Sequence, residues 1–165
     1  MKADPKVLDY LNMVLTNELT AVNQYFLHAR MLDNWGVTKL GAYEYKESLE
    51  EMRHADELMK RILFLEGVPN VQRLNTILVG ESVEEILRCD LRLEEKAIAD
   101  LRQAIPYCES VGDFVSRDLF ARILSDEEHH VDFVETQFDL IARIGMENFI
   151  QLNSGAAGAE KEGQD

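Results

Sequence analysis

The sequence predicts an all-α fold, namely a four-helix bundle with one long crossover connection and a short fifth helix. Two observations favour this fold. Four runs of roughly 27 to 32 residues carry apolar side chains at intervals of three and four, the period of an amphipathic helix. The connection 67–81, "GVPNVQRLNTILVGE", lacks that period and exceeds the short loops that join antiparallel neighbours in a bundle. No segment has the pattern of a convincing strand.

Capping and breaking residues set the ends of the predicted helices. Asp4, Ser82 and Asp113 each precede a helical run and can cap it, because their side chains accept hydrogen bonds from free backbone N–H groups. Gly67 and Pro69 end the second run. These signals predict long helices over 5–35, 38–66, 82–112 and 113–145, and a short fifth helix over 146–152.

Length and composition predict one domain and restrict its partners. The chain has 165 residues, of which 46% are apolar, enough for a single sizeable core. We predict a domain over 1–152 and a disordered tail over 153–165, where only small and polar residues occur. The net charge of -14 disfavours nucleic acid as a partner, because phosphate binding needs clustered Lys and Arg. It suits either the attraction of cations or a solvated surface that keeps the chain in solution.

Cysteine usage and hydropathy predict a cytoplasmic protein without a membrane partner. Cys89 and Cys108 form no CxxC motif, so we expect reduced, structural thiols. Residues 1–15 are interrupted by charges and lack a cleavage-site pattern, which is atypical of a signal peptide. No apolar run approaches the roughly 18 residues of a membrane span.

Ligand-type residues interrupt all four apolar stripes near their middles. The helices over 38–66 and 113–145 each contain a Glu-x-x-His motif, whose two side chains share one helix face. The other two long helices each place a single glutamate at a core-facing position. The residues expected to meet in one core are Glu18, Glu51, His54, Glu94, Glu127 and His130.

Such a set of residues predicts a two-metal centre. Four carboxylates in an apolar core repel one another and lose several kcal/mol of hydration per ion unless cations lie between them. Two divalent metals supply the charge of +4 that balances them, and two imidazoles add neutral nitrogen ligands. Oxygen-rich ligation without thiolate suits iron or manganese better than a tetrahedral zinc site, and iron is favoured. The same pattern is known from di-iron and di-manganese carboxylate bundles.

Each of these residues, taken singly, also fits a role without metal. A lone Glu-x-x-His on a helix is usually an exposed pair. Glu18 could lie on the surface if the phase of its helix differs, and Glu94 could pair with Arg92 or Lys96. Tyr25, on the same stripe as Glu18, is either a hydrogen-bond donor within the site or an ordinary core aromatic. The joint occurrence of all six residues favours the metal centre.

The chain resembles the bacterioferritins over residues 1 to about 152. The segments that carry the resemblance are "LTNELTAVNQYFLHARM", "EEMRHADELMKRILFLEGVPN", "LEEKAI" and "DEEHHVDF". It implies a ferritin-like bundle in which the six residues above are di-iron ferroxidase ligands, with Glu51 and Glu127 as bridges. It further implies that two Fe(II) ions per subunit are oxidised by dioxygen or hydrogen peroxide. Dimers would assemble into a hollow shell of 24 subunits that stores ferric mineral, and a ferredoxin-type reductant is the candidate partner for iron release.

The resemblance also bears on Met52 and on a second iron site. Met52 follows Glu51 and therefore points about 100° away from it around the helix, which by spacing alone suggests an apolar interface residue. Bacterioferritins bind haem b between two subunits through one methionine from each, and Met52 matches that position. The family's inner-surface iron site uses a His and an Asp where this chain has Lys46 and Glu50. A cationic Lys46 is a poor iron ligand, so that site is left open.

Two alternative functions share the same helical pattern. A rubrerythrin-like di-iron peroxidase would have the same bundle and carboxylates, but it normally carries a cysteine-rich rubredoxin segment that this chain lacks. A non-catalytic bundle, either a haem electron-transfer protein or a metal-free protein, is the other alternative. Iron-dependent oxygen uptake separates an enzyme from the haem protein, and metal analysis identifies the metal-free one.

Overall fold

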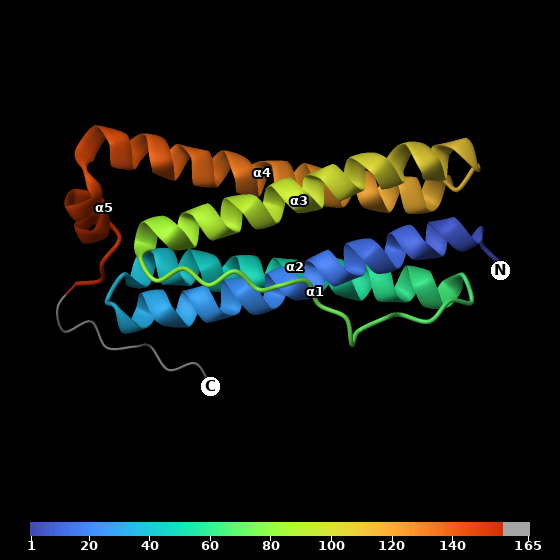
Figure 1. The fold of residues 1–165 in the computed structure, drawn as a ribbon, viewed down its shortest axis with the longest axis horizontal. Helices are drawn as coiled ribbons and strands as arrows, with labels where there is room; N and C mark the ends of the chain where they lie inside the picture. The colour runs from blue at the N-terminus through green and yellow to red at the C-terminus, as the bar shows by residue number, and fades with distance from the viewer. Residues whose placement is uncertain (157–165) are drawn as a thin grey trace.

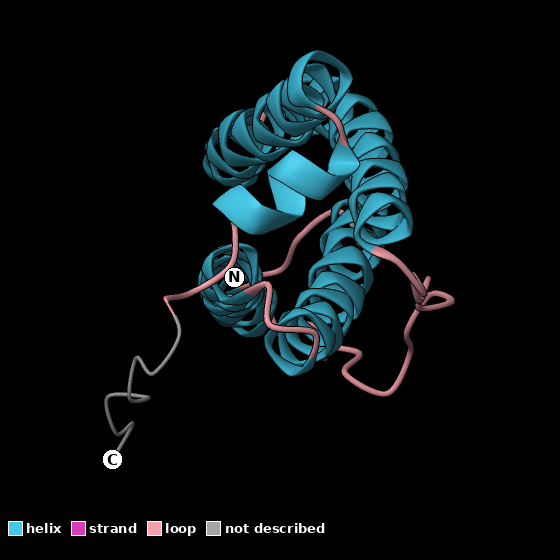
Figure 2. Cartoon of the chain, turned by 90° about the vertical axis from the view of Figure 1, so that its left-hand side faces the viewer, coloured by secondary structure: helices cyan, strands magenta, loops and turns pink. Residues whose placement is uncertain are grey.

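The computed structural model describes residues 1–156, which form five helices: α1 (Pro5–Asn34), α2 (Thr38–Phe64), α3 (Val83–Ser110), α4 (Phe114–Ile144) and α5 (Met146–Leu152). The first four form an elongated bundle (Figure 1). Viewed from one end, α5 crosses the end of that bundle (Figure 2). The described residues contain no strand, so the predicted all-α bundle with a short fifth helix is confirmed.

The predicted helix starts are confirmed by side-chain caps. Asp4, Ser82 and Asp113 each accept a backbone N–H from the first turn of the following helix, at 2.8, 3.2 and 3.0 Å. These bonds satisfy N–H groups that have no partner within the helix. The sequence signals therefore identified the caps correctly.

The end of α2 differs slightly from the prediction. The helix stops at Phe64 rather than at residue 66, and Glu66 adopts a left-handed conformation with φ of 61°. The Gly67 N–H then donates to the Ile62 carbonyl at 2.9 Å, which closes the last turn. A Cβ atom at Gly67 would lie 2.7 Å from Leu8 Cδ2, so a larger residue there would require the end of the Leu8 side chain to shift.

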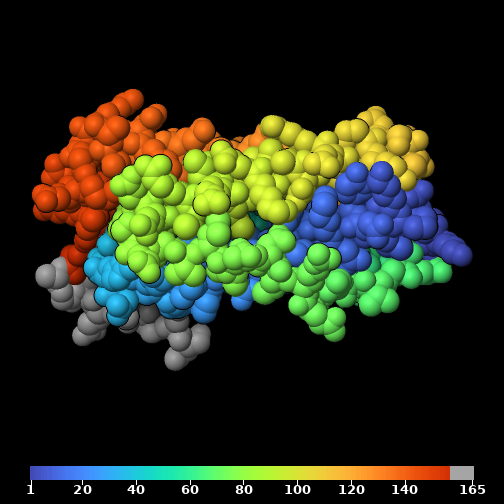
Figure 3. Space-filling view, in the orientation of Figure 1, coloured from blue at the N-terminus to red at the C-terminus, as the bar shows by residue number. Residues whose placement is uncertain are grey.

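The long connection between α2 and α3 lies along the bundle beside α1 (Figures 1 and 3). Polar side chains of α1 accept its backbone N–H groups at 2.8–3.1 Å, which gives an irregular segment the hydrogen-bond partners it needs. The pairs, acceptor first, are Asn12 with Asn70, Thr20 with Asn75, Gln24 with Leu78 and His28 with Gly80. The predicted crossover is confirmed.

The core consists of two apolar clusters with a polar zone between them. One cluster includes Leu58 and Phe120, and the other includes Leu40 and Phe149, so α5 contributes to the second. On α1 the first cluster ends at Leu15 and the second resumes at Leu32, which leaves the intervening turns for polar residues.

The chain stays hydrogen-bonded beyond the predicted domain boundary at 152. The Asn153 carbonyl accepts the Lys39 N–H at 2.9 Å, and the Ser154 hydroxyl donates to the Ile150 carbonyl at 2.7 Å. The first residues of the expected tail 153–165 are thus hydrogen-bonded to the helices, and its part 157–165 lies outside the described residues.

Two further observations concern the cysteines and the hydropathy of the helices within residues 1–156. Cys89 and Cys108 are both free thiols, and burial raises the pKa of Cys108 to about 11. Within the same range no helix is both long and apolar enough to cross a membrane.

Candidate metal centre

The six predicted ligands come together in the polar zone of the bundle. All four glutamates are 1% exposed, and the two histidines are 7% and 5% exposed. The glutamate of α1 faces the core, so its helix phase was interpreted correctly, and the glutamate of α3 is turned away from its exposed cationic neighbours. The residues are Glu18 from α1, Glu51 and His54 from α2, Glu94 from α3, and Glu127 and His130 from α4.

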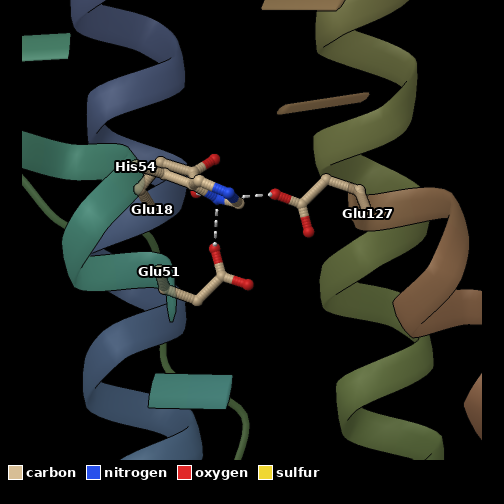
Figure 4. A group of neighbouring side chains, drawn as sticks. All are labelled: Glu18, Glu51, His54 and Glu127. Carbon is tan, nitrogen blue, oxygen red and sulfur yellow. Dashed lines mark hydrogen bonds and ion pairs between the residues drawn. The ribbon is translucent and has the colours of Figure 1, made fainter. Parts of the chain in front are cut away.

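Within this zone the ligand atoms form two groups of four, each with its atoms within 4.8 Å of one another. Glu51 and Glu127 belong to both groups, whereas the remaining residues belong to one each. Figure 4 shows the first group, in which α1 and α2 present their side chains toward Glu127 of α4. The groups are Glu18, Glu51, His54 and Glu127, and Glu51, Glu94, Glu127 and His130. This arrangement can hold two metal ions that share two carboxylates.

Each histidine turns Nδ1 toward its group. His54 Nδ1 lies 3.0 Å from Glu18 Oε2, and His130 Nδ1 lies 3.1 Å from Glu127 Oε2. Nδ1 is therefore the nitrogen placed to bind a metal in both cases.

The other ring nitrogens contact carboxylates that the sequence analysis did not select. His54 Nε2 lies 3.1 Å from Asp126 Oδ2, and His130 Nε2 contacts Glu47. Carboxylates in such positions orient a ligating imidazole. Glu47 could have been found from its spacing, since it precedes the α2 motif by four residues on the same face, but Asp126 has no such signal.

Lys46 and Glu50, the residues at the position of the family's inner-surface iron site, differ in their surroundings in the structure. Glu50 can join Glu47 and His130 in one group of potential ligands, or His54 and Asp126 in another. Lys46 is exposed and belongs to neither group. Next to the centre, the chain therefore offers carboxylates on the far side of both histidines, and Glu50 can take part in either group.

The buried carboxyls interact strongly with one another and with the histidines. Burial, followed by the charge of Glu127, raises the pKa of Glu18 and of Glu94 well above the ordinary value. For Glu51, burial favours the neutral acid, but hydrogen bonds from both histidines outweigh it and lower the pKa. In the metal-free protein, protons on Glu18 and Glu94 therefore reduce the repulsion among the four carboxyls. In the metal-bound protein, the metal ions have this effect instead.

Both histidines are held in their protonated form by the same carboxylates. Burial alone would lower each pKa, but hydrogen bonds, first to Glu127, raise the pKa of His54 and of His130 far above 6.5. A metal ion must displace these protons, because only a neutral imidazole binds it.

These shifts predict that the metal-free protein loses stability as the pH rises. Glu18 and Glu94 keep protons in the folded state that they release on unfolding above about pH 4.5, and the histidines do the same above about pH 6.5. The free energy of unfolding then falls by about 1.4 kcal/mol per pH unit for each such proton. The thermal midpoint of metal-free protein should be lower at about pH 9 than at about pH 6, and Zn(II)-loaded protein should show a flatter profile. A metal-free midpoint that rises over this range contradicts the prediction.

Tyr25 lies within hydrogen-bonding reach of the centre. Its hydroxyl donates to Glu94 Oε1, and the side chain is 1% exposed. The first of the two alternatives for Tyr25 is therefore confirmed, and the residue helps to orient Glu94.

Met52 lies on the outer side of α2. It is 47% exposed whereas its neighbour Glu51 is buried, as the helix phase predicted. Leu49, three residues earlier on the same face of α2, is also exposed, and so is Phe26 of α1, whose ring packs against Tyr45 of α2 with centroids 6.1 Å apart. The residue thus belongs to a surface that displays several large apolar side chains.

A four-helix bundle with one long crossover, two Glu-x-x-His motifs and two single core glutamates defines a ferritin-like carboxylate protein. The sequence model of the ferritin family, described as the ferritin-like domain, matches residues 8–144 of this chain. The bacterioferritin of Brucella melitensis is 49% identical over 95% of this chain and 98% of its own length, and that of Rhodobacter capsulatus 47% over 93% and 96%. The bacterioferritin of Streptomyces coelicolor is 50% identical over 88% and 87%. This chain belongs to the bacterioferritins, and iron storage is its function, which decides against the rubrerythrin-like and metal-free alternatives.

Proposed function

We propose that this iron-storage protein is a ferroxidase, which oxidises Fe(II) at the six-residue centre and stores the ferric product as mineral. The observation that supports this most directly is the pair of ligand groups that share Glu51 and Glu127. Four carboxylates balance two divalent ions, so two Fe(II) ions can bind side by side in an otherwise apolar bundle. Iron is the substrate of this reaction.

Two adjacent Fe(II) ions suit a two-electron oxidant. Each ion gives up one electron, and dioxygen takes two electrons and two protons to become hydrogen peroxide. Hydrogen peroxide takes two further electrons and two protons to become two molecules of water. The glutamates bind and align the ions, the histidines bind as neutral imidazoles, and burial of the ligands restricts access of bulk water.

Assembly into a shell of 24 subunits, built from dimers, is part of the proposal. It is supported by the named relatives and by large apolar side chains exposed at one end of the bundle, which other copies would cover. These are Leu63, Phe64, Phe114 and Val115. A cytoplasmic location and a ferredoxin-type reductant for iron release complete the expected setting.

We further propose that haem b binds between two copies, with Met52 of one protomer and Met52 of its partner as the axial ligands. An exposed, uncharged thioether on an apolar surface fits this role, since thioether is an established ligand of haem iron. When bound, haem supplies one-electron transfer. Leu49 and Phe26 would help to shield it from water.

Oxygen uptake tests the ferroxidase proposal. Adding two Fe(II) per subunit to metal-free protein in air should produce rapid iron oxidation and oxygen consumption well above a buffer control. Prior loading with two Zn(II) per subunit should suppress the rapid phase, because Zn(II) accepts the same ligands and does not change oxidation state. Oxidation no faster than in buffer overturns the proposal.

A further inference from the structure

A second buried polar cluster lies outside the six ligands. It consists of His28 from α1, Glu44 from α2 and Asp90 from α3, which are 0%, 1% and 0% exposed. One ligand-type atom of each lies within 4.8 Å of the other two. None of the three belongs to the proposed iron centre, so the cluster needs its own physical account.

The hydrogen bonds of this cluster fix the state of His28. The Gly80 N–H donates to His28 Nε2 at 3.1 Å, so Nε2 carries no proton. Nδ1 then holds the proton of a neutral imidazole and donates to Asp90 Oδ1 at 2.9 Å. Gln24 Nε2 donates to the same oxygen at 2.9 Å. His28 therefore orients Asp90 without supplying a positive charge.

Two carboxyl oxygens of the cluster, Glu44 Oε2 and Asp90 Oδ2, have no hydrogen-bond partner within residues 1–156. If both carboxyls were ionised, two uncompensated charges would lie in the bundle at a cost of several kcal/mol each. The two carboxyls are within hydrogen-bonding reach of each other, so a single proton shared between them removes one charge and provides a hydrogen bond between the side chains. Asp90 already accepts two donors, which favour its ionised form, so the proton belongs on Glu44.

We propose that Glu44 is a neutral carboxylic acid at physiological pH, donates to ionised Asp90, and so acts as a positioning residue for the crossover. Asp90 holds the side chains of Gln24 and His28, and these accept the backbone N–H groups of Leu78 and Gly80. The acid thus fastens the last part of the crossover to α1. This inference does not depend on the proposed ferroxidase activity.

The surroundings of Glu44 favour its neutral form. Burial, followed by the charge of Asp90, raises the pKa of Glu44 well above its ordinary value. The other acidic groups near it act in the same direction, and His28 is neutral. The titratable groups that face it are Tyr25 and His28 on α1, Glu47 on α2, and Asp90 and Glu94 on α3.

A metal ion is the other species that could neutralise the pair. Unlike His54 and His130, His28 accepts a backbone N–H at Nε2, so its proton must stay on Nδ1 and neither nitrogen can bind an ion. An ion would find only the two carboxylates as protein ligands. That number is below the usual coordination of zinc, iron or manganese, and the full burial leaves little access for water ligands. A proton satisfies the same two oxygens without further ligands.

Infrared spectroscopy of Zn(II)-loaded protein tests the proton. Zn(II) ionises the carboxyls of the iron centre, so their protonated C=O bands should vanish, whereas a band from Glu44 should persist at neutral pH. Glu44→Gln should abolish the remaining band, and Glu50→Gln, a partly exposed glutamate on the same helix, should leave it unchanged. If no band persists, the proposal is overturned. In that case the Zn(II) content of Glu44→Gln shows what replaces the proton. A content one ion per subunit below the parent identifies a cation between Glu44 and Asp90, and an unchanged content shows that both carboxyls are ionised.

Hydrogen exchange of the crossover tests the positioning role. In Glu44→Gln the amide can still donate to Asp90, so exchange across residues 75–81 should match the parent. In Glu44→Ala the donor is lost, and exchange there should accelerate by about fivefold or more. Parent-like exchange in Glu44→Ala overturns this role. If that variant does not fold, the infrared comparison of parent with Glu44→Gln still decides whether Glu44 carries the proton.

Discussion

Replacing Glu94 or His130 by alanine should slow the fast phase of Fe(II) oxidation on the order of 100-fold. Both residues belong to only one of the two ligand groups, so each variant impairs one metal position and spares the other. A single Fe(II) cannot deliver two electrons in one step. Stopped-flow absorbance of the ferric product measures the rate, and Zn(II) content should fall from two toward one per subunit.

Neighbouring residues provide matched controls for this experiment. Glu95 and His129 have the same chemistry as the ligands beside them but are exposed, so Glu95→Ala and His129→Ala should oxidise iron at the parent rate. If Glu94→Ala and His130→Ala also keep the parent rate, the proposed centre is wrong. Stability must be measured separately, because Glu94→Gln removes one of four crowded carboxyls and should raise the unfolding temperature of metal-free protein.

The fold was predictable because local signals and the tertiary structure agree. The apolar period identified all four long helices, and Asp4, Ser82 and Asp113 cap three of them as expected. The end of α2 was placed two residues late, because it depends on the left-handed conformation of Glu66 and on the approach of Gly67 to Leu8. That approach involves residues far apart in the sequence, so no local pattern reports it.

The polar residues also divide into those that a local sequence pattern identifies and those that only contacts between distant residues bring together. The meeting of the six proposed metal ligands was predictable because each interrupts an apolar stripe, and two pairs have Glu-x-x-His spacing. His28, Glu44 and Asp90 lie on three different helices, and none of them belongs to a Glu-x-x-His motif that would have drawn attention to it. Only the packing of α1, α2 and α3, together with the path of the crossover, shows that they form one cluster.

Replacing Met52 by leucine should reduce bound haem to background and abolish the spectrum of a bis-methionine haem. Leucine keeps most of the apolar volume but has no sulfur to bind iron, so the dimer should persist. Iron oxidation should stay close to the parent rate, because Met52 lies on the exposed side of α2 while Glu51 and His54 lie on the buried side. Haem absorbance, subunit assembly and the stopped-flow rate should be measured on the same preparation.

Met59→Leu is the matched control for this substitution, since Met59 is also on α2 but packs against the apolar core. It should retain the parent haem content, which would separate loss of the axial ligand from a general effect of methionine replacement. An unchanged haem spectrum in Met52→Leu would show that Met52 is not the ligand. Loss of both haem and rapid iron oxidation would instead show that the two faces of α2 are coupled, because neither Glu51 nor His54 is altered by the substitution.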